Sequence, residues 1–105
     1  MHHILGVLHG VSIHRTEELI PLMEHVVTEL GLTEVNRAFH QFEPFGATGV
    51  IVLSESHFSA HTYPENASVY LDIFCCSNDF KPDKAKECIQ RIFRADCFDF
   101  KYIPR

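Results

Sequence analysis

The chain has 105 residues and a mass of 12.1 kDa, which fits a single domain and leaves no room for a separate cofactor-binding domain. Hydrophobic residues make up 46% and charged residues 22% of the chain, which excludes a disordered or low-complexity protein. The formal net charge is −5 and no cluster of Lys and Arg interrupts it, which argues against nucleic acid or an anionic membrane as a partner.

The first third of the chain predicts a strand followed by a helix. Residues 3–9 form a short, mostly apolar segment that includes β-branched side chains, as in a buried strand. Over residues 16–30, apolar side chains recur at three- and four-residue spacing, which is typical of an amphipathic helix that Gly31 ends. Because Pro21 removes a backbone hydrogen bond deeper than the first turn, we expect regular helix only from about Leu19.

The rest of the chain predicts four more strands and a second helix. The helix opens at Lys81-Pro82, where proline suits the first helical position. Residues 57–66 are polar, aromatic and contain proline, so we interpret them as a functional loop between two strands. The predicted strands are residues 34–42, 47–55, 68–76 and 97–103.

This order of elements predicts an α+β fold. We expect a two-layer sandwich in which a mainly antiparallel sheet of four to five strands carries two helices on one face, and in which residues 1–105 form one domain. The other sheet face also holds many apolar residues. In so small a chain, that face is expected to pack on a second copy or to line a site, so we predict a homodimer.

The four cysteines show neither a Cys-x-x-Cys pair nor zinc-finger spacing, so no structural metal is expected. The N-terminus lacks a basic region followed by an apolar run, and no segment approaches roughly 18 apolar residues. These features predict a soluble, reduced, cytoplasmic protein. Three cysteines are assigned to packing: Cys75, Cys88 and Cys97.

Residues 55–65, Glu-Ser-His-Phe-Ser-Ala-His-Thr-Tyr-Pro-Glu, form the strongest local signal because they concentrate histidines, serines and carboxylates. His57 and His61 have the spacing of helical zinc ligands, but Pro64 and the neighbouring strands argue against a helix, so no metal site is assigned. A Ser-His hydrolase is another alternative, but the chain contains no G-x-S-x-G motif, the turn that presents the nucleophilic serine in one large class of these enzymes. A polar loop whose histidines bond only to the backbone is the structural alternative.

Further motifs surround this segment, and together they cover the middle of the chain. They are His40-Gln41-Phe42-Glu43-Pro44, Gly46, Thr48-Gly49-Val50, Leu53, Glu55-Ser56-His57, His61-Thr62-Tyr63-Pro64-Glu65, Asp72, Phe74 and Cys76. In order and distance they resemble the short, prokaryotic type of S-adenosylmethionine decarboxylase, a self-processing, pyruvoyl-dependent family. Spaced elements that agree in this way are far more specific than one short motif.

The resemblance implies that the chain makes its own cofactor. The Ser56 hydroxyl would attack the carbonyl of Glu55 and turn the peptide bond into an ester. His61 would remove the α-proton of Ser56 as the ester leaves, while Thr48 hydrogen-bonds the developing intermediate. The products would be a β chain and an α chain that begins with a pyruvoyl group: residues 1–55 and residues 56–105.

The same resemblance implies decarboxylation of S-adenosylmethionine to the aminopropyl donor for spermidine synthesis, through a Schiff base between the substrate amine and the pyruvoyl group. Cys76 would protonate the carbon that loses carbon dioxide, since a thiol is mostly protonated at neutral pH. Phe42 and Tyr63 would stack on the adenine ring or the sulfonium cation. Glu65 would bind the ribose hydroxyls, and His57 is also placed among the substrate-binding residues.

Two residues depart from the family pattern. Phe45 stands where a polar residue is usual, and Ser77 stands where glycine is common. Because both could reshape the pocket, the same chemistry on ornithine or arginine is an alternative, as is a non-catalytic regulatory homologue. Five histidines receive no role: His2, His3, His9, His14 and His25.

Overall fold

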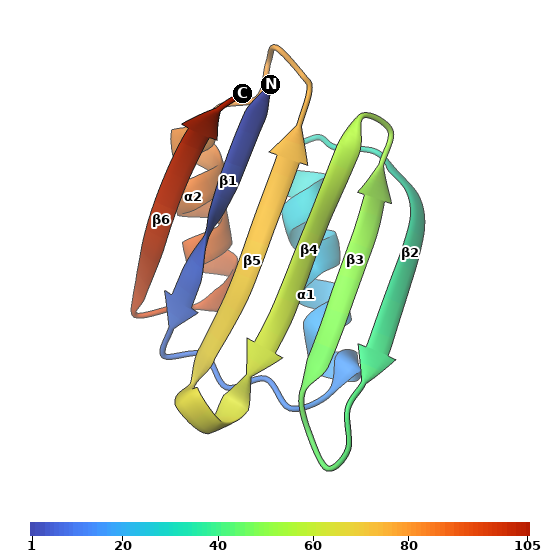
Figure 1. Ribbon diagram of the computed structural model, residues 1–105, viewed down its shortest axis with the longest axis vertical. Coiled ribbons are helices and arrows are strands. Elements are labelled where there is room, and N and C mark those ends of the chain that lie inside the picture. Colours follow the sequence, from blue (N-terminus) through green and yellow to red (C-terminus); the bar gives the residue numbers. More distant parts are fainter.

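Six strands form one antiparallel sheet in the computed structural model, which describes residues 1–105 (Figure 1). Their order across the sheet is β2-β3-β4-β5-β1-β6, and every neighbouring pair is antiparallel. The strands are β1 (His2–His9), β2 (Glu34–Gln41), β3 (Ala47–Leu53), β4 (Ser56–Tyr63), β5 (Ser68–Cys75) and β6 (Cys97–Pro104).

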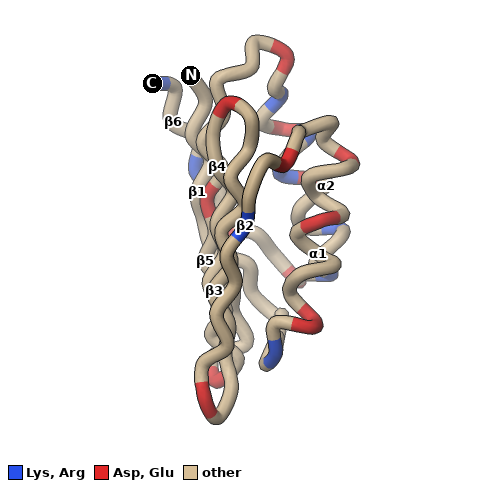
Figure 2. The backbone as a smooth tube through the Cα atoms, turned by 90° about the vertical axis from the view of Figure 1, so that its right-hand side faces the viewer, with Lys and Arg blue, Asp and Glu red and all other residues tan.

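Two helices, α1 (Thr16–Glu29) and α2 (Pro82–Phe93), cover one face of the sheet, and a 3-10 turn, η1 (Pro64–Asn66), joins β4 to β5. Figure 2 shows the two layers edge-on, with the sheet on one side and both helices on the other. The predicted α+β sandwich is therefore confirmed. Gly31 takes the left-handed conformation expected after the first helix, with φ +69°. Neither helix is long and apolar enough to cross a membrane.

The segment predicted as a functional loop is mostly strand β4, so the sheet has six strands and the expected count of four to five is wrong. Phe58, Ala60 and Thr62 are buried and alternate with more exposed residues such as His57 and His61. This alternation has the period of a half-buried strand. This periodicity is difficult to recognise in the sequence because the exposed positions carry polar and aromatic side chains of the kind common in functional loops.

Helix α1 begins at Thr16 and not near Leu19, and Pro21 lies inside it. Pro21 is exposed, so the carbonyl that loses its partner one turn earlier is not trapped in the core. The helix start is held instead by the Glu18 carboxylate, which accepts a hydrogen bond from the backbone N–H of Arg15 (3.1 Å). This contact satisfies one of the donors that a helix N-terminus leaves unpaired.

The hydrophobic core lies between the sheet and the helices. Leu19 and Met23 of α1 and Ile89 of α2 are fully buried in one cluster with Ile4 and Phe58 of the sheet. Burying each such side chain stabilises the fold by roughly 1.5–3 kcal/mol. The core therefore determines which face of every strand is turned toward the helices.

The other face of the sheet carries no helix, and we call it the open face. Val52 and Tyr70 point to this face and are 42% and 48% exposed. Leu5 and Val7 of β1 also lie on it and are only partly buried. An exposed apolar surface of this kind is typical of a contact with another protein surface. The homodimer through this face stays a prediction.

One carboxylate, Asp72 of β5, lies among these apolar residues. Its Oδ2 atom accepts hydrogen bonds from Nε2 of His3 on β1 (3.0 Å) and from Nε2 of His57 on β4 (3.1 Å), and the Ser59 hydroxyl donates to Oδ1. Burial alone would raise the pKa of Asp72, but the hydrogen bonds from Ser59, His3 and His57 outweigh it and hold the pKa below its ordinary value of 3.8. The Asp72 cluster thus links three neighbouring strands.

The Asp72 cluster predicts a stabilisation that is lost in acid. Because the pKa of Asp72 is lower in the folded than in the unfolded chain, its contribution is complete above the ordinary value of 3.8 and disappears as pH falls through the folded value. Asp72→Asn should lower the free energy of unfolding by about 1 to 3 kcal/mol at neutral pH. This deficit should shrink below about pH 4, which urea denaturation over a pH series measures.

The matched control is Asp99→Asn, at an exposed position of β6 on the same face. It removes a carboxylate that makes no side-chain hydrogen bond, so the acid dependence of the wild-type chain should be retained. If the deficit of Asp72→Asn stayed constant down to about pH 3, the linkage argument would be wrong.

Candidate active site

Ser56 begins β4 directly after the turn from β3, at one end of the sheet (Figure 1). Its backbone is paired with Leu53 on one side and with Cys75 on the other. Directly opposed residues share a face of the sheet, so the Ser56 side chain points toward the helices, as the buried Cys75 does. The Glu55–Ser56 peptide bond therefore lies where the turn enters the strand.

The Ser56 hydroxyl is buried and has no hydrogen-bond partner. An unpaired buried hydroxyl costs about 1 to 3 kcal/mol, and most buried polar groups in native proteins are paired. Ser68, whose hydroxyl is also unpaired, lies at the opposite end of β5. No hydrogen bond therefore holds the Ser56 hydroxyl in place, and the Glu55 carbonyl directly precedes it in the chain.

A small cavity of about 230 Å³ borders Ser56. It lies where the β3–β4 turn and the end of β5 meet the segment after α1. Its lining residues are Gly31, Leu32, Thr33, Ser54, Glu55, Ser56, Cys75 and Ser77. The Glu55–Ser56 bond thus borders open space on one side.

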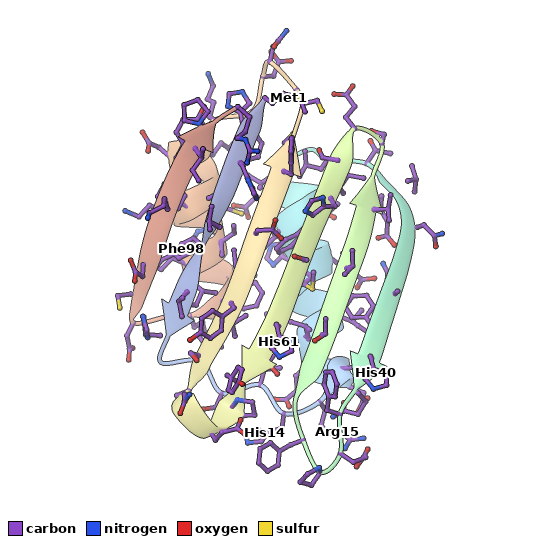
Figure 3. The ribbon with its side chains drawn as sticks, viewed as in Figure 1. Met1, His14, Arg15, His40, His61 and Phe98 are labelled. Carbon is purple, nitrogen blue, oxygen red and sulfur yellow. The ribbon has the colours of Figure 1, made fainter.

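The opposite end of the open face holds a hydroxyl and an imidazole in contact. Thr48 Oγ1 and His61 Nδ1 are 2.6 Å apart, between directly paired residues of β3 and β4. The rings of Phe42 and Tyr63 flank the imidazole, with centroids 5.9 and 5.7 Å from it. Both rings are more than a third exposed, so their faces are available to a ligand. Figure 3 shows His61 toward the end of the sheet away from Met1.

The predicted site residues therefore fall into two groups. Ser56 and His61 are five residues apart on one strand, which corresponds to about 17 Å. One end of the sheet holds Phe42, Thr48, His61, Tyr63 and, in the turn after β4, Glu65. The other end holds Glu55, Ser56, His57 and Cys76. Within one copy of the chain, His61 does not reach Ser56.

The four cysteines are free and lie in two kinds of environment. Cys75 and Cys88 are buried, as expected for packing. Burial, together with the nearby Glu29 carboxylate, raises the pKa of Cys88 to about 12, so it is not a nucleophile at neutral pH. Cys97 is exposed at the start of the edge strand β6, where no element covers it, so its assignment to packing is wrong. Cys76 is exposed just after β5.

His57 and His61 do not share a metal ion. Both lie on the open face of β4, but four residues along a strand span about 13 Å, whereas zinc ligands lie roughly 2 Å from the metal. His57 donates to Asp72, and His61 is paired with Thr48. No group of three or more His, Cys, Asp or Glu side chains could hold a metal ion.

Two features of the site are absent from the sequence-based prediction. The hydrogen bonds of Asp72 to His3 and His57 could be inferred only once the strands are paired, because the three residues then share a face. Gln41 bonds to the Phe42–Gly46 turn and to the start of α1. Its partners are backbone atoms, so no residue pattern in the sequence points to it.

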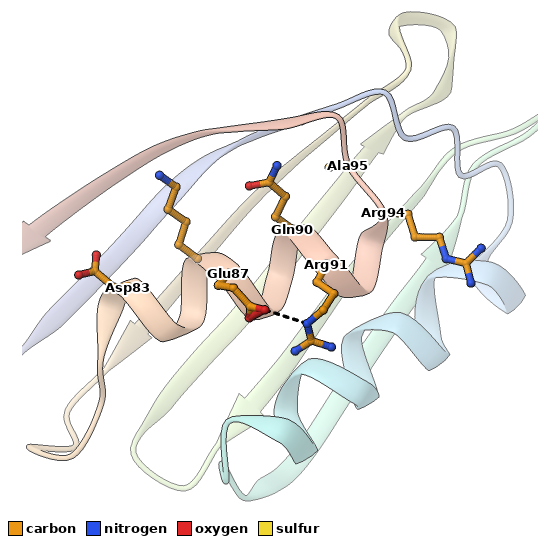
Figure 4. A pocket seen from close by; sticks show the side chains of 7 residues that line it. Asp83, Glu87, Gln90, Arg91, Arg94 and Ala95 are labelled. Carbon is orange, nitrogen blue, oxygen red and sulfur yellow. Dashed lines mark hydrogen bonds and ion pairs between the residues drawn. The ribbon is translucent and has the colours of Figure 1, made fainter.

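A larger cavity, of about 740 Å³, lies along α2 and contains none of the predicted residues. Its lining is mostly charged: Asp83, Lys86, Glu87, Gln90, Arg91, Arg94 and Ala95. Arg91 Nε donates to the Glu87 carboxylate (2.9 Å; Figure 4), and the same guanidinium pairs with Glu29 of α1. The Arg91–Glu87 pair lies within α2 and the Arg91–Glu29 pair bridges the two helices, whereas the predicted site residues lie on the sheet and its turns.

A sequence model described as S-adenosylmethionine decarboxylase matches residues 2–105. Three proteins named S-adenosylmethionine decarboxylase proenzyme are similar over 98% of this chain: those of Picrophilus torridus (36% identity, 82% of the relative covered), Persephonella marina (41%, 80%) and Archaeoglobus fulgidus (37%, 95%). The crystal structure of the adenosylmethionine decarboxylase from Aquifex aeolicus matches the fold with a TM-score of 0.89, at 34% identity, over 99% of this chain and 88% of that one. Sequence and fold thus agree over nearly the whole length, and the chain belongs to the S-adenosylmethionine decarboxylase family.

Proposed function

We propose that this chain is a self-processing decarboxylase that converts S-adenosylmethionine to the aminopropyl donor for spermidine synthesis. The family and the name proenzyme carried by its relatives support this activity. The observation that carries the proposal is the buried, unpaired Ser56 hydroxyl beside the Glu55 carbonyl. A proenzyme of this kind needs a side-chain nucleophile that is free to attack its own backbone.

The surroundings of Ser56 suit a pyruvoyl group made in place. The hydroxyl has no hydrogen bond to break, and the adjoining cavity of about 230 Å³ leaves space for residue 56 to move once the bond to Glu55 is cut. A pyruvoyl group supplies a carbonyl that accepts the electrons released with carbon dioxide. The protein's own residues must then bind the substrate and deliver a proton.

Processing begins when Ser56 Oγ attacks the carbonyl carbon of Glu55 and the amide nitrogen leaves, which converts the peptide bond to an ester. His61 removes the α-proton of residue 56, and the ester bond to Oγ breaks. The main-chain carboxylate of Glu55 departs as the new C-terminus, and residue 56 becomes dehydroalanine. Tautomerisation to an imine and addition of water then release ammonia and leave the keto group. Thr48, 2.6 Å from His61 Nδ1, orients the imidazole for the proton transfer, and its hydroxyl hydrogen-bonds the developing intermediate.

We place these groups together through a homodimer, because about 17 Å separates Ser56 from His61 within one copy. Two copies would pack through their open faces about a two-fold axis that crosses the strands. The Ser56 end of one sheet then meets the Thr48–His61 end of the other. Because the Ser56 side chain points toward the helices, the open face presents the backbone of residue 56 and not its hydroxyl, and the partner's His61 would reach the α-proton from that side. Exposed apolar side chains such as Val52 and Tyr70 support burial of this face.

The aromatic side chains beside His61 favour S-adenosylmethionine over ornithine or arginine. Phe42 and Tyr63 present exposed ring faces that can stack on adenine or attract a sulfonium cation. Glu65 is exposed in the next turn, where its carboxylate can accept hydrogen bonds from ribose hydroxyls. Ornithine and arginine have no purine or ribose to cover these groups.

We assign the remaining roles to residues at the other end of the sheet. Cys76 delivers the proton to the carbon that loses carbon dioxide, and His57, held by Asp72, contacts the substrate.

We also propose that the protein works in the cytoplasm, because its four cysteines are free thiols and Cys97 is exposed.

Ser56→Ala should block cleavage because it removes the nucleophile. On incubation, the intact mass of the wild-type chain should change from 12.1 kDa to two species of about half that mass, residues 1–55 and residues 56–105. Ser68→Ala, which removes the other unpaired hydroxyl, is the matched control and should cleave like the wild type. A wild-type chain that never splits, or a Ser56→Ala chain that splits at this bond, would overturn the proposal.

Cys76→Ala should cleave normally but lose decarboxylation by about 100-fold or more, the usual contribution of a proton donor. Release of carbon dioxide from carboxyl-labelled S-adenosylmethionine, measured per cleaved chain, tests this. Cys75→Ala applies the same truncation to the neighbouring buried thiol and should keep most of the activity. Full activity of Cys76→Ala would show that another group donates the proton.

A further inference from the structure

We propose that Gln41 is a positioning residue that holds the aromatic wall of the substrate site in place. The inference rests on the proposed function, because it assumes that Phe42 contacts the substrate. Gln41 is the last residue of β2, and its side chain lies on the helix side of the sheet, opposite the buried Ala47. From there it reaches both the turn after β2 and the start of α1.

The Gln41 amide uses its acceptor and both of its donor hydrogens. Oε1 accepts a hydrogen bond from the backbone N–H of Thr16 (2.7 Å). Nε2 donates to the carbonyls of Phe42 (2.9 Å), Gly46 (2.9 Å) and His14 (3.0 Å), so two hydrogens are shared among three acceptors. No charged or apolar side chain of this size offers both an acceptor and two donors.

These contacts connect the turn to a rigid support. Thr16 is the first residue of α1, whose N-terminal N–H groups have no partners within the helix. The preceding segment is fixed to the same helix because the Glu18 carboxylate accepts hydrogen bonds from the N–H groups of His14 and Arg15 (3.1 Å each). Gly46 N–H donates in turn to the His14 carbonyl (2.8 Å). The turn is therefore held against α1 and not merely tethered to the sheet.

The position of the Phe42 ring depends on this support. The ring is 42% exposed, and its aromatic neighbours are His40 and His61, with centroids 4.6 and 5.9 Å away. Its own backbone N–H donates to the Gly46 carbonyl (2.8 Å), which also accepts from Gln41. Because the core does not clamp the ring, its placement beside His61 follows from the backbone that Gln41 holds.

The groups that make and break bonds are anchored separately. Thr48 and His61 lie in the paired strands β3 and β4. The start of β3 is held by a hydrogen bond from the N–H of Ala47 to the Thr62 hydroxyl (2.9 Å). Loss of the Gln41 contacts should therefore disturb substrate binding while cleavage and the chemical step are spared, which raises KM with little change in kcat.

The test is Gln41→Glu, which keeps the length and the acceptor for Thr16 but turns a carboxylate oxygen toward three carbonyls. We expect KM for S-adenosylmethionine to rise about tenfold, kcat per cleaved chain to stay within about twofold, and the extent of cleavage to stay unchanged. Gln41→Met, of similar shape without hydrogen bonds, should shift KM in the same direction. If circular dichroism shows that Gln41→Glu does not fold, Gln41→Met still tests the proposal.

The matched control is Gln90→Glu, the same substitution at the other glutamine of the chain, on α2. It should leave KM and kcat at the wild-type values. An unchanged KM in folded Gln41→Met, or an equal loss of kcat and of cleavage, would overturn the positioning role while the wild-type enzyme stays active. Absence of activity in the wild type and in Gln90→Glu would instead refute the proposed function.

Discussion

The pairing of β4 between β3 and β5 is the constraint on which the rest of the structure depends. The register sets Ser56 opposite Cys75 and His61 opposite Thr48. Because a strand has a period of two, burial of Phe58 in the core turns the histidines of the same strand to the open face. A slip of one residue would exchange the two faces, so the energy of core burial also orients the proposed functional groups.

The length of β4 separates two groups of side chains that the proposed processing reaction requires together. The nucleophile lies at one end of the strand, and the imidazole with its hydroxyl partner lies at the other. A chain of 105 residues builds only one sheet and one helical layer, which leaves an apolar face exposed. A second copy would cover that face and join the two halves, and a cofactor made from Ser56 would need no large pocket of its own.

Much of the fold could be predicted from periodicity, because apolar spacing reports the side that faces the core. The helix that contains Ile89 and the alternation around Ile51 are clear examples. Strand β4 was predicted as a loop because His57 and His61 occupy its solvent side. The start of α1 was predicted too late because an exposed proline such as Pro21 is tolerated inside a helix. The site residues follow from a family resemblance, but their division between two ends of the sheet depends on strand pairing, which a linear sequence does not display.

Mixed dimers of two inactive chains test the shared site most directly. Ser56→Ala keeps the imidazole but has no nucleophile, and His61→Ala keeps the nucleophile but has no base. The two chains would be co-expressed with different affinity tags, purified through both tags, and analysed by intact mass. A shared site predicts that His61→Ala chains are cleaved only when paired with Ser56→Ala chains, whose His61 lies across the interface. Mixed dimers that stay uncleaved, or His61→Ala homodimers that cleave alone, would contradict it.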